Sequence, residues 1–224
     1  MKLKNNKNLV PFQQLKNLFL LLMICNIGYA QEVGILKYDG GGDWYANPTA
    51  IPNLIRFCNE NIRTNIDEKP DNVEPQSKEL FNYPIVFLTG HGNVYFSEDA
   101  IDNIRNYLIS GGFLHISDNY GLDSYIRREM KKVFPEIEFI EIPFDHAIYH
   151  QSYDFEGLPK IHEHDKKPAR GYGLFYEGRL ICFYDYESDL SDGWEDESVH
   201  NDPPEVRLKA LQMGANIISF AFKN

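Results

Sequence analysis

Residues 36–48 read Leu-Lys-Tyr-Asp-Gly-Gly-Gly-Asp-Trp-Tyr-Ala-Asn-Pro, a stretch in which an apolar run ends in three glycines before a helix start. This order of strand, glycine turn and helix is typical of the first unit of an α/β fold. Three glycines remove every Cβ, so the backbone can adopt positive φ and another group can approach closely. We interpret the turn and the residues after it as one wall of a ligand-binding site: Gly40, Gly41, Gly42, Asp43 and Trp44. The alternative is a structural turn with the tryptophan packed over it.

The N-terminal residues 1–30 have the pattern of a secretory signal peptide. A basic leader with four lysines and no acids precedes a short apolar core at residues 18–25, and Gly28 and Ala30 place small residues at the −3 and −1 positions before Gln31. We therefore expect cleavage near Ala30, a periplasmic or secreted protein, and no membrane span in the mature chain. The predicted domains are the signal peptide, residues 1–30, and one α/β domain, residues 31–224.

Charge and cysteine content limit the partners of the mature chain. Removing four lysines and no acids changes the formal net charge from −11 to −15, which disfavours nucleic acid and anionic membranes as partners. The two remaining cysteines, Cys58 and Cys182, fall in a predicted helix and a predicted strand. We expect two buried free thiols rather than a disulfide.

Strands and helices alternate along the mature chain. The continuous apolar run Ile85–Thr89 indicates a central parallel strand covered on both faces. The predicted strands are 34–38, 64–66, 85–89, 113–117, 138–142, 172–176 and 179–184, the last two forming a hairpin across Glu177-Gly178. The predicted helices are 50–61, with Thr49 as N-cap, 77–82, 97–110, 124–134 and 204–222, and the stretch 67–76 is predicted to be a loop. This order indicates a doubly wound, mostly parallel sheet in a single domain.

Glycine, histidine or acid follows five of the predicted strands, where a core would need none. Such sheets bind ligands at the carboxyl ends of their strands. We expect the following residues, together with Gly40–Trp44, to converge there on a small polar ligand: His91, Asp118, Asn119 and His146. His91 and Asp118 are the candidate catalytic residues. Each has a structural alternative, a loop hydrogen bond for His91 and a helix cap for Asp118.

No metal site or cofactor is assigned from the sequence. His146 and His150 are four residues apart, a spacing that suits two ligands on one helical face, but Pro143 and the Asp-His sequence favour a loop there. His162 and His164 flank Glu163 in a polar loop and are interpreted as solvated side chains.

Several long motifs resemble the domain of unknown function 4159 family. They are LKYDGGGDWYANPTAIPNL, IVFLTGHGNVYFSEDAIDNIRNYLISGGFLHISDNYG, RREMKKVFPE and IPFDHAIYHQSYDF, and the resemblance covers essentially the whole mature chain. It implies a class I glutamine amidotransferase-like domain with a flavodoxin-like α/β sandwich. In that superfamily a nucleophilic cysteine follows a central strand, whereas the matching turn here reads Ser117-Asp118-Asn119-Tyr120-Gly121 and has no cysteine. Thiolate-dependent glutaminase chemistry is therefore not expected.

Three functions remain open at this point. The first is a binding module in which Trp44, Tyr45 and Trp194 stack on a small polar ligand such as a sugar. The second is a hydrolase, metal-assisted in one version, that uses His91, Asp118 and His146. The third is a scaffold for another envelope protein with the acidic loop 185–197 as its face, which predicts an exposed apolar patch. The sequence does not identify the ligand or the oligomeric state.

Overall fold

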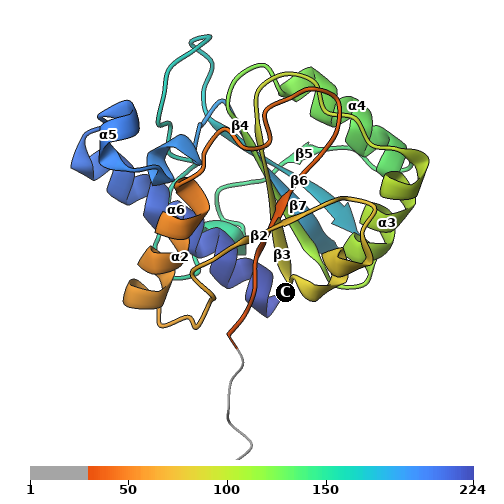
Figure 1. The fold of residues 1–224 in the computed structure, drawn as a ribbon. Coiled ribbons are helices and arrows are strands. Elements are labelled where there is room, and N and C mark those ends of the chain that lie inside the picture. The colour runs from red at the N-terminus through yellow and green to blue at the C-terminus, as the bar shows by residue number, and fades with distance from the viewer. Residues whose placement is uncertain (1–29) are drawn as a thin grey trace, which may run out of the picture. The chain divides into compact units, whose positions relative to one another are not determined.

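Seven strands form one sheet in the order β2-β1-β3-β4-β7-β6-β5 (Figure 1). The structure is a computed structural model that describes residues 30–224, so the predicted signal peptide lies outside the described residues except for Ala30. The strands are β1 (Gly34–Leu36), β2 (Asp71–Val73), β3 (Ile85–Gly90), β4 (Phe113–Asp118), β5 (Ile140–Glu141), β6 (Arg170–Tyr176) and β7 (Arg179–Tyr186). The first five strands in the sheet order pair in parallel, and β6 is antiparallel to both β7 and β5.

Helices cover both faces of this sheet (Figure 1). They are α2 (Ala50–Asn61), α3 (Glu98–Ile109), α4 (Asp123–Val133), α5 (Glu197–His200) and α6 (Pro204–Lys223), with short 3-10 helices η1 (Lys78–Asn82), η2 (Ala147–Tyr149) and η3 (Asp192–Trp194). The apolar faces of α2 and α6 pack with Ile85, Phe87 and Phe113 in one core. The apolar faces of α3 and α4 pack with Val86, Leu88 and Leu114 in the other. Residues 31–224 thus form one mixed α/β domain with a mostly parallel sheet.

Most predicted elements are present, and their ends follow capping chemistry. The helix predicted at residues 50–61 is α2, and the Ser97 hydroxyl accepts a hydrogen bond from the Ala100 amide at the start of α3, as an N-cap should. Thr49 precedes α2 but makes no side-chain cap. The residue is at the N-cap position, as predicted, but its hydroxyl donates to Glu195 instead of accepting from the first turn of the helix. In the turn between β6 and β7, both Glu177 and Gly178 adopt positive φ, as a tight hairpin requires.

The prediction of a loop over residues 67–76 is wrong in its middle. Asp71–Val73 forms β2, which pairs in parallel with β1 at the edge of the sheet. Only Val73 of these three residues is buried, so the segment has no apolar alternation to reveal a strand. The strand expected near Ile66 is reduced to an isolated bridge between Ile66 and Gln31.

Both cysteines of the described chain are free and buried, as predicted. Burial raises the pKa of the Cys58 thiol to about 12 and also raises the pKa of Cys182. Neither thiol is therefore a thiolate near neutral pH. Within residues 30–224, no helix is long and apolar enough to cross a membrane.

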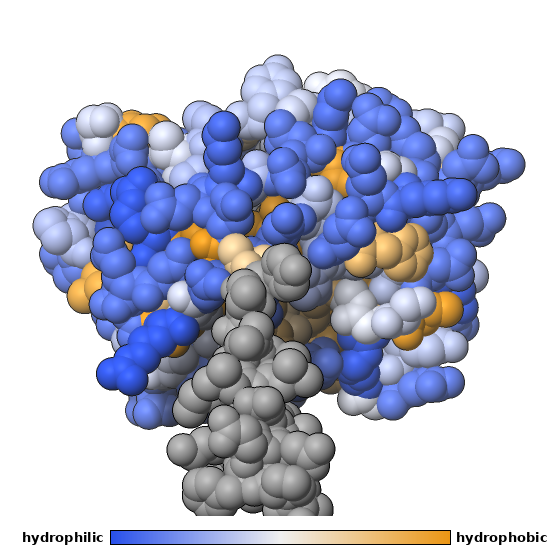
Figure 2. Space-filling view, turned by 60° about the horizontal axis from the view of Figure 1, so that its bottom comes forward, coloured by the Kyte–Doolittle hydropathy of each residue, from blue (hydrophilic) through white to orange (hydrophobic). Residues whose placement is uncertain are grey.

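Surface hydrophobic residues do not form a large continuous patch on the face drawn in Figure 2. Hydrophilic side chains dominate that face, and the hydrophobic ones appear as small separate groups (Figure 2). The large exposed hydrophobic residues of the described chain come from many different elements, among them Tyr45, Phe81, Tyr95, Ile109, Tyr120, Ile140, Phe144, Val199 and Leu208. The visible part of this face therefore shows no large apolar patch of the kind that the scaffold function predicts.

Candidate functional site

The glycine turn after β1 packs against the loop after β3. The Gly42 amide donates a hydrogen bond to the Asn93 carbonyl at 3.0 Å, and a Cβ on Gly42 would lie 2.7 Å from that oxygen. Gly40 has φ 113°, and a Cβ there would lie 2.8 Å from the Tyr95 nitrogen. Gly41 has φ 86° and no atom near its Cβ position. Close approach of two chain segments thus explains the glycines at positions 40 and 42 without a ligand.

Asp43 and His91 meet at the outer end of this turn. The Asp43 carboxylate accepts a hydrogen bond from the His91 amide at 2.5 Å, and its second oxygen lies 3.1 Å from His91 Nδ1. Both side chains are largely exposed, at 37% and 53%. The structure therefore joins two predicted site residues, and the loop hydrogen bond considered as the alternative for His91 is present.

Asp118 is the last residue of β4 and is buried. Its carboxylate accepts hydrogen bonds from the Leu122 amide at 3.1 Å and from the Tyr184 hydroxyl at 3.0 Å. Burial raises the pKa of Asp118 to about 6, in spite of these two hydrogen bonds. Leu122 immediately precedes α4, so the hydrogen bond from its amide to Asp118 is the contact at the start of a helix that the helix-cap alternative expected. The hydrogen bond from Tyr184 is a second contact that this alternative did not include. Asp118 and His91 share no hydrogen-bond partner among the described residues.

The turn after β4 opens beside a polar cavity of about 310 Å³ that includes Asp118, His164, Lys167 and Asp189 in its lining. Tyr120, rather than Asp118, has the left-handed backbone in this turn, with φ 76°. Its ring stacks on His164 with the ring centroids 4.7 Å apart. Non-glycine residues with positive φ often mark functional sites, which makes this turn a candidate site without a cysteine.

Asn119 supports a group of polar residues on the α2 side of the sheet. Its amide donates to the Asn47 side-chain oxygen at 2.5 Å, and its own oxygen accepts hydrogen bonds from Ser191 at 2.8 Å and Thr89 at 3.1 Å. All three partners line the cavity between the sheet and α2 that is described below, whereas Asn119 itself does not line it. Asn119 therefore positions the polar residues of that cavity.

His146 is not brought to the carboxyl ends of the strands. It is the N-cap of η2, where its Nδ1 accepts a hydrogen bond from the Ile148 amide. Its ring packs on Phe175 and Phe220, and Phe220 in turn packs on Phe113, the first residue of β4. His146 therefore lies toward the opposite end of β4 from Asp118. His150 pairs with Asp154 and does not meet His146 as a second metal ligand.

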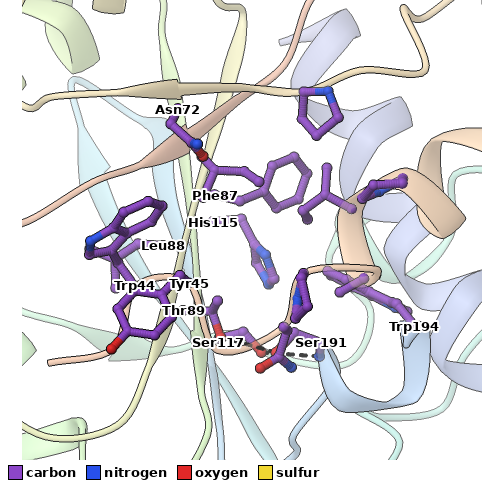
Figure 3. A pocket seen from close by; sticks show the side chains of 17 residues that line it. Trp44, Tyr45, Asn72, Phe87, Leu88, Thr89, His115, Ser117, Ser191 and Trp194 are labelled. Carbon is purple, nitrogen blue, oxygen red and sulfur yellow. Dashed lines mark hydrogen bonds between the residues drawn. The ribbon is translucent and has the colours of Figure 1, made fainter. Parts of the chain in front are cut away.

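A cavity of about 330 Å³ lies between the sheet and the start of α2 (Figure 3). Its walls are mainly apolar and include the three aromatic residues expected to stack on a ligand, Trp44, Tyr45 and Trp194. The polar residues of its lining are not Asp43, His91 and Asp118, as the binding hypothesis expected, but Asn47, Asn72, Thr89, His115, Ser117 and Ser191. Ser117 lines the cavity in place of Asp118 because successive strand residues alternate, so that these two side chains point to opposite faces of the sheet.

His115 lines this cavity in a fully buried pair with Asp185. His115 Nε2 lies 2.8 Å from Asp185 Oδ2, and the Ser117 hydroxyl donates to the other carboxylate oxygen at 3.1 Å. Burial lowers the pKa of His115 to about 3 and raises the pKa of Asp185, so burial favours the uncharged form of each group. His115 Nδ1 is buried and has no hydrogen-bond partner within residues 30–224. Sequence analysis missed His115 because it occupies an ordinary position in the strand Phe113–Ser117.

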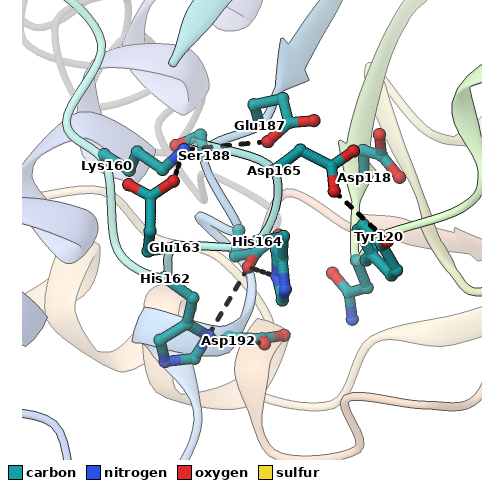
Figure 4. Close-up of polar contacts among 12 residues, drawn as sticks. Asp118, Tyr120, Lys160, His162, Glu163, His164, Asp165, Glu187, Ser188 and Asp192 are labelled. Carbon is teal, nitrogen blue, oxygen red and sulfur yellow. Dashed lines mark hydrogen bonds and ion pairs between the residues drawn. The ribbon is translucent and has the colours of Figure 1, made fainter. Parts of the chain in front are cut away.

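Three of the seven histidines meet three aspartates where the loop before β6 lies beside the segment that follows β7, as Figure 4 shows in part. The six residues are His162, His164, Asp189, Asp192, His200 and Asp202. Hydrogen bonds to Asp189 and Asp192 raise the pKa of His162 to about 10. His162 is therefore not the solvated side chain that was expected, whereas His164 is exposed, as expected, but also hydrogen bonds to Asp189. The His-x-His pair and the Asp189-x-x-Asp192 spacing were available as signals, but the separation of 25 positions between His164 and Asp189 concealed the link.

Together, the sheet and its loops define a mixed α/β protein whose polar and aromatic side chains collect mainly at the carboxyl ends of parallel strands, the usual position of ligand sites in such folds. The chain belongs to the family described as "Domain of unknown function (DUF4159)", whose model matches residues 32–222. No curated protein matched the chain.

Proposed function

We propose that this protein is an exported binding domain that holds a small, ring-shaped ligand in the cavity between the sheet and α2. The observation that carries the proposal is the unpartnered His115 Nδ1 in the wall of that cavity. A buried polar atom without a partner costs about 1–3 kcal/mol, which a ligand that supplies the missing hydrogen bond would offset. We further propose that the fold is of the class I glutamine amidotransferase-like type, without its catalytic cysteine.

The chemistry of the cavity suggests what the ligand presents. If Asp185 holds the shared proton against His115 Nε2, the other ring nitrogen carries a hydrogen and acts as a donor. The ligand then needs an acceptor oxygen opposite His115 and a flat, weakly polar face for Trp44 and Tyr45. Monosaccharides and small carbonyl-bearing rings have both features.

Ligand-observed NMR with a library of neutral ring fragments tests the proposal. Fragments that carry a hydroxyl or carbonyl group should bind the wild-type protein and lose binding in Trp44→Ala. Tyr95→Ala is the matched control, because Tyr95 is also an exposed aromatic residue but does not line the cavity. The only two tryptophans of the chain both line the cavity, so binding should also change the intrinsic fluorescence. Fragments that bind both variants equally would contradict the proposal.

Export is the second part of the proposal and is supported by the basic leader, the apolar core and the small residues before Gln31. Intact-mass analysis of protein recovered from the periplasm or medium should show a chain that starts near Gln31. A recovered chain that still begins at Met1 would exclude signal cleavage.

A further inference from the structure

We propose that His162, Asp192 and His200 bind one divalent transition-metal ion, for which Zn²⁺ is the most suitable. Asp189 and His164 complete the surroundings of this site. The proposal does not depend on the ligand proposed for the cavity beside α2, because none of the three metal-ligand residues lines that cavity.

The three ligand atoms already lie at metal-binding separations. His162 Nδ1 is 3.1 Å and His200 Nε2 is 3.8 Å from Asp192 Oδ2, and all three ligand atoms lie within 4.8 Å of one another. In a tetrahedral zinc site with bonds of about 2.0–2.1 Å, neighbouring ligand atoms are about 3.3 Å apart. Small side-chain movements would therefore bring these atoms to coordinating distance.

A buried carboxylate beside these residues supplies an independent indication. The Asp189 side chain is only 1% exposed, yet its Oδ1 has no hydrogen-bond partner in the described part of the chain. Its other oxygen lies 3.5 Å from His162 Nδ1 and hydrogen bonds to His164 Nε2. An unpaired buried carboxylate oxygen is costly, and a cation beside it removes that cost.

The outer contacts orient the ligands as in known metal sites. His162 directs Nδ1 at Asp192 while its Nε2 lies 3.1 Å from Asp202 Oδ1, which is the carboxylate–histidine–metal arrangement. Asn47 donates to Asp192 Oδ1 at 2.6 Å and so leaves Oδ2 free to face the two histidines. These contacts hold the ligand atoms of His162 and Asp192 toward one common point.

The donor set selects the type of metal. Two imidazole nitrogens and one carboxylate suit zinc and related transition metals, whereas calcium and magnesium prefer an all-oxygen shell. Three protein ligands leave a further position open. Metal binding requires all three histidines to be deprotonated, including His162 with its raised pKa. In that state the three aspartates give the cluster a formal charge of −3, which a divalent cation would largely compensate.

Zinc titration of the purified, chelator-treated protein tests the proposal. We expect one Zn²⁺ per chain by elemental analysis and a rise in melting temperature that EDTA reverses. His200→Ala should weaken zinc binding more than about 100-fold, and Asp202→Asn about 10- to 100-fold. His200 is partly exposed, so its variant should fold. His150→Ala is the matched control, because His150 also pairs with an aspartate but lies outside the cluster.

Two results would overturn the proposal. One is the absence of zinc binding in wild-type protein, which would leave a cluster held together by a protonated His162 alone. The other is zinc binding of equal strength in wild type and in both His200→Ala and His162→Ala. Neither result affects fragment binding at Trp44, so this proposal and the proposed function can fail separately.

Discussion

Two regions at the carboxyl ends of the strands pair histidine with aspartate in opposite surroundings. Within the sheet, His115 and Asp185 are 1% and 0% exposed and lie on adjacent strands, and register pairs Asp185 with Ser117, two residues from His115. In the loops, His162 is 23% exposed and faces three different aspartates. The sheet fixes one pair in one geometry, whereas the loops gather several groups of similar chemistry.

The difference teaches what each region can do. His115 belongs to a pair excluded from water, lines the cavity and has one buried nitrogen without a partner in the described residues, which suits hydrogen bonding to an uncharged ligand. A half-buried cluster with excess negative charge suits a cation. A third pair, His91 and Asp43, is more exposed than either, and its contribution to stability is the reference against which the other two regions are compared.

The largest effect should come from Asp185→Ala. This change leaves His115 Nε2 and the Ser117 hydroxyl buried without their partner, and we expect a loss of about 3–5 kcal/mol in the free energy of unfolding. Urea denaturation measures it. Asp185→Asn keeps an acceptor and a donor at the same place and should lose clearly less. Equal losses for the two variants would mean that the hydrogen bonds of the pair contribute little.

Asp118 tests the effect of burial alone on an aspartate, because it is buried without a histidine partner. Its folded-state pKa of about 6 exceeds the ordinary value of 3.8, so the folded state binds its proton more tightly than the unfolded state does. The free energy of unfolding should therefore fall as pH rises from about 4 to 6, by up to about 3 kcal/mol. Asp118→Asn should remove this fall. Parallel pH profiles of wild type and variant would contradict the prediction.

Asp192→Ala tests the loop cluster in metal-free protein. It removes the acceptor of Asn47 and one partner of His162, and these contacts are only partly screened from water. We expect a loss of about 1.5–3 kcal/mol, the range for hydrogen bonds to charged groups. Chemical denaturation in EDTA measures this loss without any metal. A loss as large as that of Asp185→Ala would show that the two regions do not differ as described.

The smallest effect should come from Asp43→Ala. The pair with His91 is largely exposed, and exposed ion pairs contribute about 0–1 kcal/mol. We expect a loss of no more than about 1 kcal/mol, measured in the same denaturation assay. A loss above 2 kcal/mol would show that the Asp43 hydrogen bond to the His91 amide organises the whole glycine turn.

Local sequence patterns were enough for most elements of the fold. Helix α2 was predicted with its observed limits, and the apolar run at Ile85 and the strand at Phe113 lie where expected. These patterns work because a surface helix buries one face, which repeats every 3.6 residues, whereas a central parallel strand buries both faces and is a nearly continuous apolar run. Strand β2 was not predicted because Asp71–Val73 has no pattern of alternating apolar residues, and its pairing with β1 makes it a strand.

By itself, the sequence determined the alternation of strands and helices, the family and the concentration of polar residues after the strands. Only the tertiary structure decided which of those residues meet. In the structure Asp43 contacts His91, whereas His146 lies away from the carboxyl ends of the strands. The histidines with unusual surroundings are His115 and those of the loop cluster. The physical reason is distance along the chain. Burial patterns act between near neighbours, whereas a site such as His162, Asp192 and His200 forms only when separate segments fold against one another.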